Sequence, residues 1–121
     1  MCIRDSRKAL LAAVEKGDPG RPSPKAEAFH VNEKDRAWVD SKTTLQPNGV
    51  ALQPIKLTGA REKVAKKTYI RAARYPQPAF DKALAECKAD KSWQTHVNEN
   101  TGHDVMVDQP EWLADIIVKA S

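Results

Sequence analysis

The 121-residue sequence has few of the residue types that disulfide-rich, metal-binding and membrane proteins require. It contains two cysteines, Cys2 and Cys87, five glycines and only 6% aromatic residues. Two cysteines so far apart predict neither a disulfide framework nor a zinc site. No apolar run approaches the length of about 20 residues that spans a membrane. We therefore expect a reducing, cytoplasmic setting, with no membrane, metal or cofactor.

The charges that are present make a weak case for nucleic-acid binding. The formal net charge is +4, and basic residues are interspersed with acidic ones. The densest basic cluster is interrupted by Glu62 and lacks regularly spaced aromatic residues, so we predict a solvated face there and no nucleic-acid partner. This cluster consists of Arg61, Lys63, Lys66, Lys67, Arg71 and Arg74.

The first half of the sequence predicts helices separated by loops. A helix is predicted over residues 7–16, where apolar spacing is helical and Gly17 can end it. Residues 17–25 hold three prolines and two glycines, which predicts a loop. Asn32 is a good cap for a second helix, which fades by Lys42. Residues 46–49 predict a turn.

The second half of the sequence alternates between strand and helix patterns. Strands are predicted over residues 66–72 and 92–98, and helices over residues 78–88 and 110–120. Such alternation is typical of an α/β fold with a parallel sheet. Two strands do not form a sheet that can bury itself. We therefore expect an incomplete sheet that belongs to a larger α/β protein.

One stretch, NTGHDVMVDQPEWLADIIVKA, concentrates the chemistry. His103 follows a predicted strand, comes directly after Gly102, and lies seven positions before Pro110, which opens the last helix. This order predicts an imidazole at the carboxyl edge of a parallel sheet, where open α/β folds place their sites. We expect Gly102 to allow a tight turn that projects the ring.

With these residues in this order, the sequence resembles the α/β-hydrolase superfamily. It looks most like the carboxylesterase branch that includes the plant methylesterases and hydroxynitrile lyases. Residues 61–121 carry the resemblance, in the segments KKTYIRA, PAFDKALAECKA, WQTHVN, TGHDVMVDQP and EWLADIIVKA. Residues 29–62 resemble more loosely the lid of bacterial members and its return to the core. The resemblance implies that residues 7–60 are a helical lid segment and residues 61–121 the C-terminal part of the core.

The resemblance also implies a reaction and a role for His103. His103 would be the general base and acid of a Ser-His-acid triad that hydrolyses a small-molecule carboxylic ester. An imidazole suits this role because its ordinary pKa lies near neutral, so that it can take and return a proton. The hydroxynitrile lyases of this branch carry a lysine after the histidine, whereas this sequence has Asp104. Ester hydrolysis is therefore the better prediction.

The sequence departs from the family's pattern at the other two triad positions. No serine has the Gly-x-Ser-x-Gly framing of a nucleophile, so we predict that this chain alone is inactive. The triad acid should follow the TYI strand, but residues 72–75 there are AARY. Asp81 is the nearest candidate for the acid. Its alternative role is that of a carboxylate in the first turn of a helix.

The other candidate residues have mainly structural interpretations. Trp38 and Met106 are candidates for lining an acyl pocket under the lid, although such apolar residues are usually core. His96 alternates on a strand and is expected at the surface or in ordinary packing. His30 has no partner at metal-ligand spacing.

Two other functions stay open from the sequence. The parent protein could be another hydrolase of the same fold, such as an epoxide hydrolase or dehalogenase with an aspartate nucleophile. A different class would be a small non-catalytic interaction domain. That reading requires a complete sheet, which two strands fit poorly.

The opening hexapeptide MCIRDS has an explanation outside the fold. The codons ATG-TGT-ATA-AGA-GAC-AG(C/T) encode it, and this string resembles the transposase mosaic-end adaptor of sequencing libraries. We therefore expect residues 1–6 to be adaptor-derived and the rest to be a C-terminal fragment. Cys2 then has no functional role.

Overall fold

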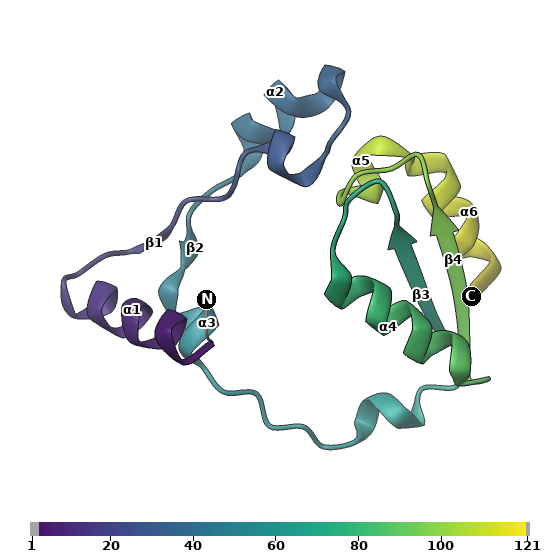
Figure 1. Ribbon diagram of the computed structural model, residues 1–121, viewed down its shortest axis with the longest axis horizontal. Helices are drawn as coiled ribbons and strands as arrows, with labels where there is room; N and C mark the ends of the chain where they lie inside the picture. Colours follow the sequence, from purple (N-terminus) through teal and green to yellow (C-terminus); the bar gives the residue numbers. More distant parts are fainter. Residues whose placement is uncertain (1–2, 121) are drawn as a thin grey trace. The chain divides into compact units, whose positions relative to one another are not determined.

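A computed structural model describes residues 3–120 of the chain, with side chains from Arg7 onward (Figure 1). Met1 and Cys2 of the expected adaptor-derived hexapeptide lie outside the described residues. The chain divides into two compact units. The first unit extends to Pro24 and includes Lys42–Thr58, and the second combines Lys25–Ser41 with the chain from Gly59 onward.

Helix α1 (Ile3–Glu15) of the first unit confirms the predicted helix and its end. Gly17 adopts a left-handed φ of 78°. The main-chain N–H groups of Gly17 and Asp18 donate to the carbonyl oxygens of Val14 and Ala13, at 2.9 and 3.0 Å. These two hydrogen bonds satisfy carbonyls that the end of a helix leaves unpaired, and glycine tolerates the required φ.

The predicted loop and turn of the first unit contain short regular elements. Strand β1 (Gly20–Arg21) pairs antiparallel with β2 (Gln46–Pro47), and helix α3 (Asn48–Leu52) follows at once. The side-chain amide of Asn48 donates to the carbonyl of Asp18 at 2.9 Å. Strands of two residues are too short to show a repeating pattern in the sequence.

The second unit begins with short helices around a small apolar core. They are η1 (Ala26–Phe29) and α2 (Glu33–Lys42), and η2 (Ala60–Lys63) follows later in the chain. Helix α2 starts directly after Asn32, as predicted. Ala26, Val31 and Val39 form the core. Val107, near the other end of the chain, packs against it.

The strand and helix order of the C-terminal half matches the prediction. Strand β3 (Lys67–Ala72), helix α4 (Pro78–Ala89), strand β4 (Trp93–Asn98) and helix α6 (Pro110–Ala120) follow one another. Strands β3 and β4 are parallel and in register from Lys67↔Trp93 to Ala72↔Asn98. The predicted loop before α6 contains a further short helix, α5 (Val105–Asp108).

Helices α4 and α6 cover opposite faces of the β3–β4 pair (Figure 1). The hydroxyl of Tyr69 donates to the carbonyl of Phe80 in α4 at 3.0 Å. Thr95 of β4 pairs with Tyr69, so its neighbour His96 faces the opposite side of the sheet. The ring of His96 meets Trp112 of α6 with centroids 6.4 Å apart. Because neighbouring residues of a strand face opposite sides, these contacts define three layers around an incomplete sheet, a partial α/β arrangement.

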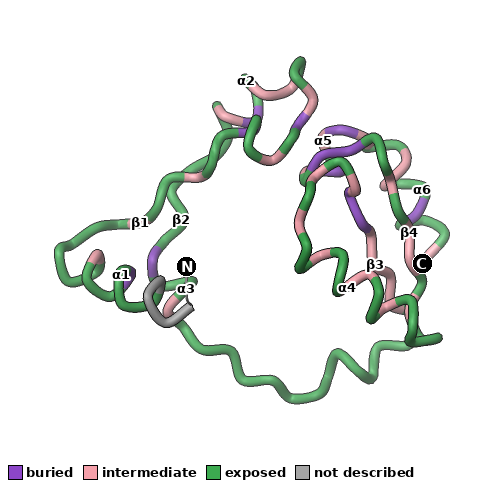
Figure 2. The backbone as a smooth tube through the Cα atoms, in the orientation of Figure 1, coloured by how far each residue is buried: buried purple, intermediate pink, exposed green. Residues whose placement is uncertain are grey.

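Burial in the second unit is concentrated near the carboxyl ends of β3 and β4 (Figure 2). The buried residues there are Arg71, Ala72, Thr101, Gly102, Val105 and Asp108. None of the helices among residues 3–120 is long and apolar enough to cross a membrane.

Candidate functional site

His103 lies in the loop after β4, at the carboxyl edge of the parallel pair. Its main-chain N–H donates to the carbonyl of Phe29 at 2.8 Å. Its exposed ring stacks on Phe80, with centroids 5.6 Å apart and planes at 12°. The rings of Tyr75 and Phe29 lie at 5.1 and 5.4 Å. The imidazole is therefore held by one main-chain hydrogen bond and three aromatic neighbours.

Gly102 is needed for a reason that the sequence did not reveal. The described glycines with a left-handed φ are Gly17 and Gly59, so Gly102 does not use the left-handed conformation that glycine adopts most easily. A Cβ at Gly102 would overlap the carbonyl of His30 and lie 2.6 Å from the carbonyl oxygen of Phe29. Glycine is required because two backbone segments approach each other closely here.

Asp108 is the central polar residue of this edge, and the sequence analysis missed it. Its side chain is 0% exposed. The carboxylate accepts hydrogen bonds from the N–H of Gly102 at 2.7 Å, the N–H of Asn32 at 2.9 Å, and Arg74 Nη2 at 3.0 Å. The signal that could have found it is a carboxylate following an apolar triplet, residues 105–107, just before a proline-led helix.

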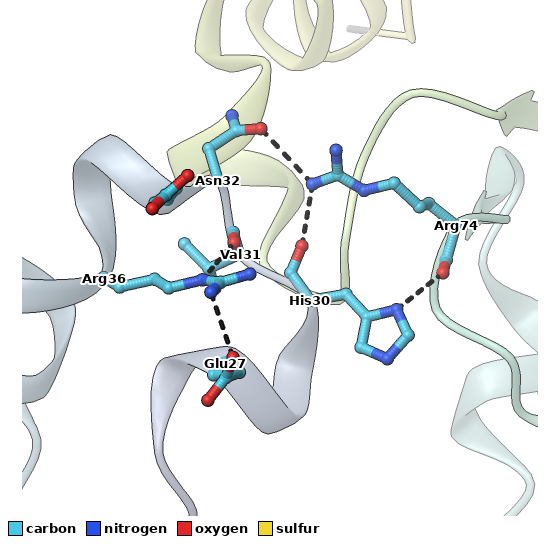
Figure 3. Close-up of a pocket in the computed structure, with 7 residues that line it drawn as sticks. Glu27, His30, Val31, Asn32, Arg36 and Arg74 are labelled. Carbon is cyan, nitrogen blue, oxygen red and sulfur yellow. Dashed lines mark hydrogen bonds and ion pairs between the residues drawn. The ribbon is translucent and has the colours of Figure 1, made fainter.

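Arg74 occupies the stretch after β3 where the resemblance implies the triad acid. Besides Asp108, its Nη2 atom donates to the carbonyl of His30 at 2.7 Å and to Asn32 Oδ1 at 3.2 Å (Figure 3). The guanidinium therefore connects β3 to the segment around η1. This place in the fold holds a cation whose carboxylate partner, Asp108, comes from the segment between β4 and α6 (residues 99–109), which we call the histidine loop.

The prediction of a solvated basic face is wrong for Arg71. The side chain of Arg71 is 4% exposed. Its Nε donates to Asp81 at 2.7 Å, and its Nη1 donates to the carbonyls of Ala72 and Tyr75. Arg71 alternates on β3 with Ile70, which places it beneath α4. Buried guanidinium groups are stable when such acceptors surround them.

Asp81, the sequence-derived candidate for the acid, bonds to Arg71. It lies in the first turn of α4, and its side chain is 60% exposed. Across residues 7–120, no carboxylate forms a hydrogen bond or ion pair with the His103 ring. The structure brings Asp81 close to the same aromatic cluster through Phe80, but it does not pair Asp81 with the histidine.

His30 contributes to the site through its backbone and one ring nitrogen. It has a left-handed φ of 57° at the end of η1. Its Nδ1 lies 2.9 Å from the carbonyl oxygen of Arg74. Because a carbonyl oxygen only accepts hydrogen bonds, Nδ1 of His30 carries the hydrogen in this contact. The ring meets Tyr75 edge-on at 5.6 Å.

Two cavities adjoin these residues. One of about 520 Å³ is drawn in Figure 3. Its lining residues are Glu27, His30, Val31, Asn32, Glu33, Arg36 and Arg74. A smaller cavity of about 190 Å³ touches His103. Its other lining residues are Tyr69, Ile70, Arg71, Ala72, Phe80 and Val105.

The remaining candidates lie away from His103's cavity. Trp38 and Met106 are 58% and 60% exposed, so neither belongs to the core of the described residues, and neither lines the smaller cavity. His96 packs on Trp112. No group of three His, Cys, Asp or Glu side chains in the described part of the chain could hold a metal ion.

Two side chains near the sheet have shifted pKa values. Burial raises the pKa of Tyr69, which lines the smaller cavity. The N–H of Ser92 donates to Asp90 and lowers the pKa of that exposed carboxyl. Tyr69 therefore stays neutral well into the alkaline range.

The fold and site define a partial α/β domain with an exposed histidine at the carboxyl edge of two parallel strands. The chain is similar to the carbendazim hydrolyzing esterase of Nocardioides sp. (strain SG-4G), with 33% identity over 95 residues. Those residues are 78% of this chain and 38% of the esterase, so the chain spans less than half the length of that relative. No protein-family model matches the sequence. No solved structure matches it either.

Proposed function

We propose that this chain is the C-terminal part of a serine ester hydrolase of the α/β-hydrolase superfamily, with His103 as the general base and acid. One observation carries the proposal. His103 lies exposed at the carboxyl edge of a parallel strand pair, within a chain that is 33% identical to an esterase over 95 residues. Open α/β folds place their sites at this edge.

The proposed reaction uses His103 twice. The imidazole takes the proton of a serine hydroxyl as the oxygen attacks the ester carbonyl, and it returns the proton to the departing alcohol. Water then attacks the acyl-serine, gives its proton to the same ring, and releases the carboxylic acid and the free serine. The serine and the oxyanion donors belong to parts of the parent protein that this chain does not contain, so the chain alone is inactive.

The proposed enzyme also needs an acid that orients His103 and a pocket for the ester. Asp81 is still the proposed acid, and its carboxylate would have to accept a hydrogen bond from the His103 ring in place of the one from Arg71. The small cavity beside His103 is proposed to hold part of a small ester. Trp38 and Met106 are proposed to meet the acyl group under the lid.

A joined enzyme tests the function. The part of the Nocardioides esterase that this chain does not match is fused to residues 7–121, and hydrolysis of p-nitrophenyl acetate is measured. We expect turnover from the fusion and none from the 121-residue chain. The His103→Ala variant of the fusion should lose on the order of 10³-fold in kcat, whereas the matched His96→Ala variant should keep its activity.

Three results would overturn the proposal. They are an inactive fusion, turnover that survives His103→Ala in the fusion, and ester hydrolysis by the 121-residue chain itself. The coding sequence upstream of Arg7 supplies an independent check on the nucleophile. A serine framed by glycines there supports the proposal, whereas an aspartate in that place points to the epoxide hydrolase or dehalogenase type.

A further inference from the structure

We propose that Arg74 and Asp108 are positioning residues for His103. Together with Asn32 and Gly102 they form what we call the Arg74–Asp108 clasp, which fastens residues 29–32 to the histidine loop. The role in catalysis rests on the proposed function of His103. The geometry of the clasp does not depend on that function.

The carboxylate of Asp108 joins three separate parts of the chain. Its donors are Gly102 in the same loop, Arg74 after β3, and Asn32, which is 76 residues away in sequence. The side chain is wholly buried, and a buried carboxylate requires such donors. Removing the carboxylate therefore leaves the N–H groups of Gly102 and Asn32 without their acceptor inside the second unit.

Arg74 completes the clasp from the other side. Its Nη2 atom donates to the His30 carbonyl and to Asn32 Oδ1 (Figure 3). The same atom donates to Asp108 Oδ2. In return, His30 Nδ1 donates to the main-chain carbonyl of Arg74 at 2.9 Å. Both the side chain and the backbone of Arg74 are thus tied to residues 30–32, so the two segments cannot shift independently.

The position of the imidazole follows from these contacts. Gly102 is fixed by Asp108 and by its close approach to His30, and the next N–H, that of His103, is fixed by Phe29. Two of the three rings around His103 are also attached to the clasp. Phe29 directly precedes His30, and Tyr75 directly follows Arg74. A displacement of about 1 Å in a catalytic group can cost about 10²-fold in rate.

The first experiment uses the full 121-residue chain and NMR. The Asp108→Asn variant keeps the size of the side chain but removes its charge. We expect weaker NOEs between the rings of His103 and Phe29, and amide exchange at Gly102 and Asn32 that is about tenfold faster or more. Amides of the β3–β4 ladder should be unaffected. The matched control is Arg36→Gln, which removes the ion pair with Glu27 and the hydrogen bond to the Val31 carbonyl on the same segment but leaves the donors of Asp108 in place.

The control should leave the His103 NOEs and the Gly102 exchange rate unchanged. Arg74→Lys is the milder second variant, because it keeps the charge but loses the guanidinium fork. It should give an intermediate effect, and it replaces Asp108→Asn if that variant does not fold. Unchanged NOEs and exchange in the folded variants would show that the clasp does not position His103.

The second experiment separates positioning from a purely structural role, with the joined enzyme described above. Rates are expressed per active site by titration with a fluorophosphonate, so that unfolded enzyme does not count. We expect Asp108→Asn to lower kcat by 10- to 100-fold and to change KM by less than about twofold. A role in stability alone would lower the titrated enzyme concentration and leave kcat unchanged, which would overturn the proposal.

The two experiments also distinguish this inference from the proposed function. If the joined enzyme with the native residues is inactive, the proposed function fails, and the NMR measurements on the 121-residue chain decide whether the clasp exists. If the enzyme is active and Asp108→Asn retains its kcat, the clasp proposal fails while the function of His103 stands.

Discussion

The two units of the chain are stabilised by different kinds of contact. In the first unit, the contacts are the Gly17 end of α1, a ladder of two residues per strand, and the buried side chains of Leu10 and Asn48. The Oδ1 atom of Asn48 is buried and, among the described residues, has no hydrogen-bond partner. The second unit has a six-residue parallel ladder and the buried polar side chains of Arg71 and Asp108.

The difference shows where tertiary structure builds the candidate site. In the first unit the hydrogen bonds that end α1 join residues five or fewer positions apart, and the side-chain bonds of Asn48 and Arg7 reach 30 and 45 positions. At the carboxyl edge of the second unit, the hydrogen bonds join residues up to 76 positions apart. Opening such an edge breaks many contacts together, so it should be the more cooperative and the more stable part.

The largest expected effect is that of adding one methyl group at the edge of the second unit. Gly102→Ala places a Cβ against the carbonyls of His30 and Phe29. Because backbone cannot move aside cheaply, we expect the free energy of unfolding to fall by about 3 kcal/mol. Urea denaturation of the 121-residue chain measures it.

Gly49→Ala in α3 is the matched control, because nothing lies within 4 Å of a Cβ there. It should leave the stability unchanged or raise it by up to about 1 kcal/mol. Equal losses in the two variants would contradict the contrast between the units.

A smaller effect is expected when the buried guanidinium is removed. Arg71→Ala leaves the carbonyls of Ala72 and Tyr75 without their donor and removes the cation facing Phe80 at 6.0 Å. We expect a loss of about 2 kcal/mol in a urea titration. Arg61→Ala removes a 77% exposed guanidinium paired with Glu62, and it should cost less than about 0.5 kcal/mol. A similar cost for both arginines would mean that the burial of Arg71 contributes little.

Gly17→Ala tests the end of α1 and should affect the first unit alone. A residue with a Cβ is strained at a φ of 78°, so we expect a cost of about 1 kcal/mol. Hydrogen exchange should become faster in α1 and stay unchanged in β3 and β4. Faster exchange throughout both units would show that they unfold together.

The smallest effect concerns Tyr69 and alkaline pH. Burial raises the pKa of Tyr69 above its ordinary 10.0, so the neutral hydroxyl is the form that the fold favours. Its contribution is fully present below about pH 10 and is lost as the pH rises through the raised value. Tyr69→Phe removes the hydrogen bond to Phe80, which should cost about 0.5 kcal/mol at neutral pH.

The variant should also show a weaker loss of stability than the native chain as the pH rises above about 10. Denaturant titrations at several pH values measure the difference. Parallel pH profiles for the two proteins would mean that Tyr69 ionises equally easily in the folded and unfolded chain.

Much of the fold was predictable where the pattern is local and long enough. The helix ended by Gly17, the two strands and the helices led by Pro78 and Pro110 all appear close to their predicted bounds. The two-residue strands β1 and β2 and the four-residue α5 were not predictable, because such short elements show no period. Trp38 and Met106 are exposed because core membership depends on which segments come to lie against them.

The sequence by itself determined the order of strands and helices and the place of His103 after β4, because apolar periodicity, helix ends and proline positions are local properties. Tertiary structure alone decided that Asp81 bonds Arg71, that Gly102 must be glycine, and that Asp108 is buried among Asn32, Gly102 and Arg74. The physical reason is that hydrogen bonds and close backbone approaches join residues distant in sequence, and no local pattern records which of them will meet.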